Sequence, residues 1–298
     1  MTPSLATADE AGRSRPRILD QAPLILGGLA FVWLFFEPFT TLLRDWWSDP
    51  EAGHGLLLGP LSLYLMVRAG LSPERRARPL LGLAILGASV LLRIASALAA
   101  ELFTMRLSLL GAAVGLMVYA WGLRQAFRWW LPLCLLALSI PLPAVILSTL
   151  ALPLQLKASA IGATLLHWRD VPVLLAGNII HLPGRSLFVT EACSGLRSLT
   201  ALASLGLLMG GIWLHRPSLR VLLLLLTLPV AVLINGLRVF LTGFLVFFVN
   251  AALGEGFLHA TEGWVMFLAA FAILGAITWM LARGERWLAN LRPSDATS

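Results

Sequence analysis

The stretch LRVLLLLLTLPVAVLINGLRVFLTGFLVFF, residues 219–248, decides the class of fold. A helix that crosses a bilayer needs about 20 predominantly apolar residues. This run is longer than that, and Arg220 and Arg238 are its only charged residues. We therefore expect a helix in lipid, long enough to tilt, break or re-enter the membrane.

The composition of the whole chain supports the same environment. Of 298 residues, 58% are hydrophobic and only 12% are charged, whereas a soluble domain carries roughly 25% charged residues. The net charge is +7, but the arginines fall mostly in short gaps between apolar runs. That distribution is typical of cytoplasmic membrane loops and argues against a nucleic-acid-binding protein.

Apolar runs along the chain predict an all-α polytopic membrane protein with about eight transmembrane helices. The predicted spans cover residues 18–36, 56–67, 80–99, 107–123, 129–140, 196–214, 219–248 and 264–281. They form a single catalytic membrane domain over residues 18–283, with polar cytoplasmic tails at 1–17 and 284–298. In the third span, Arg93 is expected to form a structural ion pair with Glu101.

One long segment, residues 141–192, separates the fifth and sixth predicted spans. Its first part is amphipathic and is predicted to lie in the membrane interface. Its second part, residues 171–190, has short β-like runs punctuated by Gly177-Asn178 and Pro183-Gly184. These turn signals predict a small hairpin or meander on the outer face.

The distribution of basic residues predicts the orientation. With a cytoplasmic N-terminus, fourteen of the 22 basic residues fall in inner segments and five in outer ones. The positive-inside rule favours this arrangement, with both termini cytoplasmic. It places Cys193, Arg238 and His259, which come from three different segments, at one depth on the outer side.

Cys193 begins the sixth predicted span. A cysteine at a helix N-terminus meets the positive end of the helix dipole, which favours thiolate over thiol. Arg197 lies four residues on, on the same helical face, and adds to this effect. A small buried apolar cysteine is the competing interpretation. Cys134 lies near the inner side, too far away for a disulfide, and a lone thiol in an oxidising compartment favours a reactive role.

Arg238 lies in the seventh predicted span, 18 residues after Arg220. At ~1.5 Å per residue this is roughly 27 Å, the outer edge of the hydrocarbon. Asn235 precedes it by three residues on the same face. Ionisable residues within spans are functional candidates, although an arginine whose side chain snorkels to the headgroups is an equal alternative.

Two histidines complete the candidate set. His259 precedes the eighth predicted span, and Glu262 lies one helical turn on, where it could orient the imidazole or simply face solvent. His54, within Gly53-His54-Gly55, begins the second span on the outer side and either shapes the same site or forms a flexible turn. No His, Cys, Asp or Glu spacing resembles a metal site, and no cofactor is expected.

Together these residues suggest an acyl-transfer site. Cys193 would be the nucleophile and His259 the general acid and base. Arg238 would stabilise the thiolate or the oxyanion of the tetrahedral intermediate. Arg197, Asn235, Glu262 and His54 would support them.

The motifs resemble those of the exosortase/archaeosortase family of membrane cysteine transpeptidases. The resemblance rests on EACSGLRSL at 191–199, NGLRV at 235–239, HATEGW at 259–264 and GHG at 53–55. Their order and spacing match over residues 54–281, and the Cys-Ser-Gly-Leu-Arg block is the most specific. The histidine favours the exosortase side of the family, and hence the inner membrane of a Gram-negative bacterium with the active site facing the periplasm.

The resemblance implies a substrate. Such enzymes are thought to act on secreted proteins with a C-terminal sorting signal of the PEP-CTERM kind, namely a short motif, a transmembrane helix and a basic cluster. They cleave near the motif and transfer the new C-terminus to an acceptor, here an unidentified glycan or lipid. The expected partners are therefore these proteins, the acceptor and membrane lipid, with no nucleic acid.

Two other functions use the same residues. A transporter or channel could bind an anionic solute at Arg197 and Arg238, with the long seventh span as a discontinuous helix. It would tolerate Cys193→Ser, since no nucleophile is needed. A non-catalytic assembly factor for exopolysaccharide export would tolerate replacement of Cys193, Arg238 and His259 as long as the fold survives.

Overall fold

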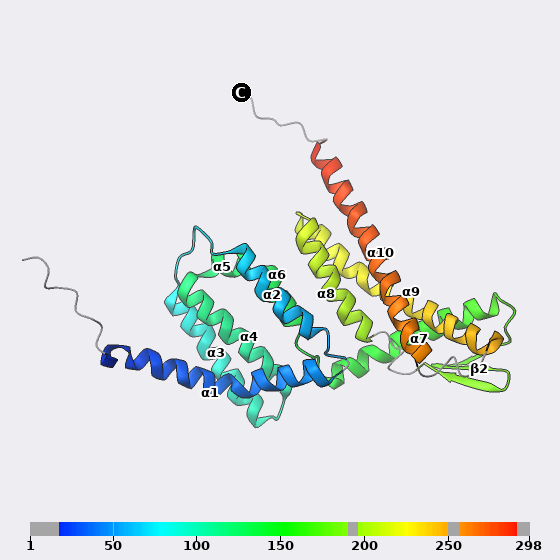
Figure 1. The fold of residues 1–298 in the computed structure, drawn as a ribbon, viewed down its shortest axis with the longest axis horizontal. Coiled ribbons are helices and arrows are strands. Elements are labelled where there is room, and N and C mark those ends of the chain that lie inside the picture. Colours follow the sequence, from blue (N-terminus) through cyan, green and yellow to red (C-terminus); the bar gives the residue numbers. More distant parts are fainter. Residues whose placement is uncertain (1–17, 50, 190–195, 250–256, 291–298) are drawn as a thin grey trace, which may run out of the picture.

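The computed structural model describes residues 18–49, 51–189, 196–249 and 257–290 (Figure 1). In this part of the chain almost every element is a helix, and the strands form one small sheet. The elements in chain order are α1 Ile18–Ser48, α2 Gly55–Ala69, α3 Pro79–Leu98, α4 Leu102–Trp121, α5 Leu123–Arg128, α6 Trp130–Leu138, α7 Ala144–His167, β1 Leu174–Ala176, β2 Ile179–Leu182, β3 Arg185–Phe188, α8 Leu196–Trp213, α9 Pro217–Phe248 and α10 Phe257–Asn290.

The predicted fold class is confirmed. Among the described helices, six are long and apolar enough to cross a membrane, and two more, within α2 and α8, are apolar but shorter. Leucine, valine and tryptophan side chains remain widely exposed on these helices. In a water-soluble protein such surfaces would be buried, so lipid is the medium that covers them. The chain is a multi-pass membrane protein.

The structure departs from the predicted spans around the middle of the chain. The predicted fifth span, 129–140, forms only the nine-residue helix α6, which at ~1.5 Å per residue is too short to cross a bilayer. The following residues form α7, which is long and apolar enough to span. Figure 1 shows α7 passing below α8 and the lower end of α10 on its way towards the sheet.

The predicted meander is confirmed as an antiparallel sheet in the order β1-β2-β3. Ala176 pairs with Ile179 across the turn at Gly177, and Leu182 pairs with Arg185 across the turn at Gly184. Both glycines have positive φ, at 63° and 77°, a conformation that costs glycine little. Inward-facing side chains of β2 join a core with α7 and α9.

The first half of the chain is a separate packing unit. Helices α3 and α4 form a close hairpin, α1 contacts α4, and α2 packs against α6. The turn after α4 requires glycine at 122, because its φ is 79° and a Cβ there would lie 1.8 Å from the carbonyl oxygen of Arg76. Helix α6 then contacts α8 and joins this unit to the second half.

Candidate functional site

Helices α8, α9 and α10 pack against one another around a shared apolar core (Figure 1). Leu202 of α8, Leu223 of α9 and Leu274 of α10 are fully buried in it. The three helices alternate in direction. The core therefore has one end where α8 and α10 begin, marked by Leu199, Leu241 and Met266, and an opposite end marked by Leu214, Leu219 and Ala282.

Three of the sequence candidates lie on the turns of α8 and α10 at the first of these ends. Cys193 itself lies outside the described residues, three positions before α8 begins. Arg197 is the second residue of α8, and His259 and Glu262 lie in the first two turns of α10. The helices that carry Arg197, Arg238 and His259 thus pack together, and the shared depth of Cys193, Arg238 and His259 stays a prediction.

Arg238 lies on the face of α9 that meets α8 and α10. It is four residues after Ile234 and three before Leu241, both members of the shared core. Residues at these spacings share a helical face. The Arg238 side chain is half-buried, and the neighbouring Asn235 is only 5% exposed.

The opposite face of α9 packs against α7. A Cβ at Gly236 would lie 2.6 Å from the side chain of Ile161, and one at Gly162 would lie 2.5 Å from Val239. Two glycines thus let the backbones of α7 and α9 approach closely, as small residues do between membrane helices. The Asn235-Gly236-Leu-Arg238 motif therefore combines a packing glycine with polar residues on neighbouring faces.

A cleft of about 110 Å³ lies on the face of α8 that points away from α9 and α10, where Thr200 is one of its lining residues. Its other walls are the α1–α2 turn and the α6–α7 connection. Polar groups come from Asp49, Glu51 and His54, and the remaining lining residues are Ala137, Leu138, Ile140, Pro141, Leu142 and Leu147. Thr200, which lines the cleft, lies in the second turn of α8 and is seven residues after Cys193 in the sequence.

His54 anchors one wall of this cleft. Its Nδ1 lies 3.1 Å from the carbonyl oxygen of Glu51, and its Nε2 lies 3.2 Å from the carbonyl oxygen of Leu138. Carbonyl oxygens only accept, so a protonated ring donates to both and a neutral ring to one. Both nitrogens thus face backbone groups, which suits an anchoring residue better than an acid or base.

The residues around His54 explain part of its Gly-His-Gly motif. The Trp46 indole N–H donates to the carbonyl oxygen of Ser139 at 2.8 Å. A Cβ at Gly55 would lie 2.1 Å from the Trp46 ring, so glycine is required by close packing. The alternative of a flexible turn therefore does not account for this glycine.

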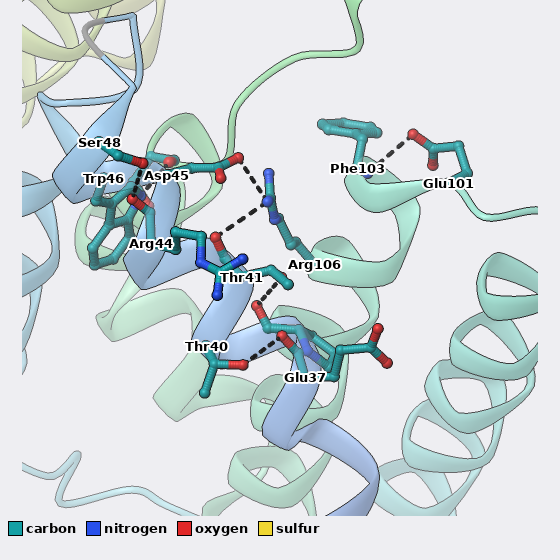
Figure 2. A network of polar contacts seen from close by, with 12 residues as sticks. Glu37, Thr40, Thr41, Arg44, Asp45, Trp46, Ser48, Glu101, Phe103 and Arg106 are labelled. Atoms are coloured by element: carbon teal, nitrogen blue, oxygen red, sulfur yellow. Dashed lines mark hydrogen bonds and ion pairs between the residues drawn. The ribbon is translucent and has the colours of Figure 1, made fainter.

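Two arginines of the first half pair with carboxylates of α1. Figure 2 shows Arg106 reaching from α4 to α1, where its guanidinium donates to Asp45 at 2.7 Å and to the carbonyl oxygen of Thr41 at 3.2 Å. Its side chain is only 3% exposed. The prediction that Arg93 pairs with Glu101 is wrong: Arg93 donates to Glu37 at 2.6 Å instead.

Glu101 has a different role, because it caps the N-terminus of α4 (Figure 2). Its carboxylate accepts from the backbone N–H groups of Phe103 at 3.0 Å and Thr104 at 2.7 Å. The Thr104 hydroxyl, together with these N–H groups, holds the pKa of the Glu101 carboxyl below its usual range. With its acceptors used in this way, Glu101 is not available to Arg93.

The other cysteine of the chain, Cys134, lies outside the α8–α10 core. Cys134 lies on α6 as an exposed free thiol, far along the chain from the converging helices. Among the described residues, no group of three His, Cys, Asp or Glu side chains is arranged to hold a metal ion.

Comparison with known proteins agrees with the motifs. No curated protein and no solved structure shows a significant match to the chain. The sequence model of the transmembrane exosortases matches residues 46–276. That range includes the Gly-His-Gly motif, the Cys193 block, the Asn235–Arg238 motif and His259. The chain belongs to the transmembrane exosortase family.

Proposed function

We propose that the chain is a membrane-embedded cysteine transpeptidase that cleaves a C-terminal sorting signal of secreted proteins and transfers the new C-terminus to an acceptor. Membership of the exosortase family implies a cysteine transpeptidase in general terms. The signal is of the PEP-CTERM kind, and the acceptor is a glycan or a lipid. The reaction takes place at the periplasmic face of the inner membrane, with both termini of the chain in the cytoplasm.

The convergence of α8, α9 and α10 is the observation that carries this proposal. Three separate segments bear a thiol, a guanidinium and an imidazole, and their helices pack around one core. Arg238 lies on the α9 face directed at the other two helices. In this proposal, the thiol and the imidazole lie at the same end of this bundle as Arg238.

The first half-reaction forms a thioester. The Cys193 thiolate attacks the carbonyl carbon of the scissile peptide bond, which places a negative charge on the carbonyl oxygen. Arg238 stabilises that oxyanion, because a preformed cation in a low-dielectric site needs no reorganisation. His259 donates a proton to the leaving nitrogen as the C–N bond breaks, and the transmembrane tail leaves with a free amine.

The second half-reaction reverses these roles. The acceptor nucleophile, a hydroxyl or an amine, attacks the thioester carbon while His259 takes its proton. The C–S bond breaks, and Cys193 returns to the thiolate. The secreted protein is then joined to the acceptor through an ester or an amide, and no oxidant, metal or cofactor is consumed.

The second half of the chain offers a route for the substrate. A substrate anchored by its own helix presents its scissile bond at the membrane surface, the level of the end of the core that carries the candidate residues. Helix α7 and the sheet cover the part of α9 beyond Arg238. Crosslinks from an anchored substrate are expected on these elements, and crosslinks confined to α3 and α4 would contradict this route.

A processing assay with matched cysteine variants tests the proposal. A secreted reporter with a sorting tail is expressed with wild type, Cys193→Ala or Cys134→Ala, and its size is followed on a gel. Cys193→Ala should stop processing at normal membrane levels, whereas Cys134→Ala should process like wild type. Hydroxylamine should release a shortened reporter held on the wild-type enzyme as a thioester.

Unchanged processing by Cys193→Ala would overturn the nucleophile assignment. Equal loss in both cysteine variants would also count against it, since Cys134 has no part in the mechanism. The thermal unfolding of each variant in detergent separates loss of chemistry from loss of fold.

A further inference from the structure

A groove of about 480 Å³ runs between α8 and α10, away from the converging end described above. Its lining residues are Met209, Trp213, Gly275, Thr278, Trp279, Ala282 and Arg286. The volume lies within the range of about 300–1,000 Å³ that is typical of small-molecule sites. The space beside Gly275 is open, because the nearest atom to a Cβ there would be the Met209 methyl carbon at 4.0 Å.

The mouth of the groove is basic and aromatic. Arg286 lines it, and the Arg283 guanidinium lies 5.4 Å from the ring centroid of Trp279. Trp213 and Trp279 are 54% and 58% exposed. Tryptophans and arginines of this kind mark the level of the lipid headgroups.

The nearby carboxylate of Glu285 offsets only one of the two arginine charges, and it does not line the groove. Glu285 is 7% exposed, and it accepts from the backbone N–H groups of His215 at 3.0 Å and Arg216 at 2.7 Å. It therefore closes the α8–α9 turn against α10. None of the described residues that line the groove is acidic, so the mouth attracts an anion.

The length of the groove fits one leaflet of a bilayer. From Gly275 to Arg286 there are eleven residues along α10, roughly 16 Å at ~1.5 Å per residue. Half of a ~30 Å hydrocarbon core is about 15 Å. An acyl chain that begins at the headgroup level of Arg286 therefore ends near Gly275.

We propose that this groove is a binding site for an anionic phospholipid of the bilayer, with its phosphate at Arg286 and Arg283 and one acyl chain along Met209, Thr278 and Gly275. Basic pockets between transmembrane helices hold anionic headgroups by the same electrostatics. The occupant is a membrane lipid and not a free anion, since the apolar length of the groove has no partner in inorganic phosphate. The site is independent of the transpeptidase chemistry.

Native mass spectrometry of the full chain in detergent tests this site. Phosphatidylglycerol and phosphatidylcholine with identical acyl chains are titrated separately, and the fraction of lipid-bound protein is measured. Wild type should prefer phosphatidylglycerol. Arg286→Gln should weaken phosphatidylglycerol binding by about fivefold, the effect of one arginine near an anionic headgroup, and leave phosphatidylcholine binding unchanged. Gly275→Leu should weaken both lipids, because its side chain fills the groove.

Two control variants match these changes elsewhere in the protein. Arg75→Gln removes an exposed arginine from the loop between α2 and α3, and Gly284→Leu adds the same side chain to α10 where no atom lies within 4 Å. Both should bind lipid like wild type. Equal loss in Arg75→Gln and Arg286→Gln would overturn the proposal in favour of general surface charge.

Competition with inorganic phosphate distinguishes a lipid from a free anion. Millimolar phosphate should not displace bound phosphatidylglycerol, and displacement at that concentration would overturn the lipid assignment. If Gly275→Leu lowers the unfolding temperature, Arg286→Gln and the double variant with Arg283→Gln still decide the outcome. Unchanged lipid preference in the double variant would refute the site.

Discussion

Arg106 in the first half of the chain and Arg238 in the second both lie in long apolar helices, but their surroundings differ. Arg106 is 3% exposed and ties α4 to α1 through Asp45 and the Thr41 carbonyl oxygen. Arg238 is half-buried next to the buried Asn235, on the α9 face that meets two other helices. One arginine joins a pair of helices, and the other lies where three helices converge.

This difference refines the rule that ionisable residues within a membrane mark function. Burial alone would rank Arg106 above Arg238. The position of each residue relative to the neighbouring helices reverses that order, because Arg106 joins one pair of helices through Asp45, whereas Arg238 lies on a helix face that meets two other helices. We therefore expect substitution of Arg238 to lower the reaction rate and disruption of the Arg106–Asp45 pair to lower the stability. The following variants test this difference.

The largest expected effect is on the reaction rate of Arg238→Gln. Loss of a preorganised oxyanion-stabilising group typically lowers kcat by about 100- to 1,000-fold, and we expect this range for reporter processing. Arg238→Lys should recover part of the rate, since it keeps the charge but not the planar fork. Initial rates per folded molecule check this, and a rate loss that only follows loss of folded protein would contradict it.

The opposite result is expected for Asp45→Asn. It leaves the buried Arg106 guanidinium without its carboxylate, which should lower the free energy of unfolding by about 3 kcal/mol, while processing per folded molecule stays near wild type. Denaturant titration in detergent measures the change. Replacing both partners, Asp45→Leu with Arg106→Met, should restore most of the stability; no recovery would show that this pair is not the cause.

A smaller and pH-dependent effect is expected for Glu101→Gln. Loss of the charged cap should cost about 1 kcal/mol at neutral pH. The pKa of Glu101 is lowered in the folded protein, so its stabilisation is present above the ordinary glutamate value of about 4.3 and is lost as the pH falls through the folded value. Thermal unfolding of wild type and variant should therefore converge in acid, and an equal gap at every pH would contradict this assignment.

The smallest effect is expected for Glu37→Gln. Glu37 pairs with Arg93, but its side chain is 63% exposed, and exposed ion pairs contribute roughly 0–1 kcal/mol. Arg93 also keeps its bond to the Leu34 carbonyl oxygen at 3.2 Å. If Glu37→Gln lowered the free energy of unfolding as much as Asp45→Asn in the same denaturant titration, solvent exposure would not explain the difference between the two ion pairs.

Much of the fold could be predicted because its signals are local. Apolar length alone indicates a membrane helix, as residues 219–248 show. The turns of the meander were predictable at Gly177 and Gly184, where glycine supplies the positive φ that the two-residue connections need. The alternating directions of α8, α9 and α10 likewise follow from successive spans joined by short connections, which bring the beginnings of α8 and α10 to one side.

The remaining features depend on contacts between distant segments. Arg93 could not be assigned to Glu37 because 56 residues separate them and Glu101 was nearer in sequence. Nothing in the sequence indicates that the Trp46 ring occupies the space beside Gly55. The segment that forms α7 was predicted to lie in the interface, and its length and apolar composition also suit a membrane span. The roles of Cys193 and His259 stay predictions.

The length of α9 has a consequence for the lipid environment in which the enzyme works. Its 32 residues extend roughly 48 Å at ~1.5 Å per residue, against a hydrocarbon core of about 30 Å. A helix that is much longer than the hydrocarbon core can fit the bilayer by tilting. Bilayers with longer acyl chains reduce the tilt and shift Arg238 relative to the headgroups, so hydrophobic thickness becomes a variable that sets the depth of the reaction.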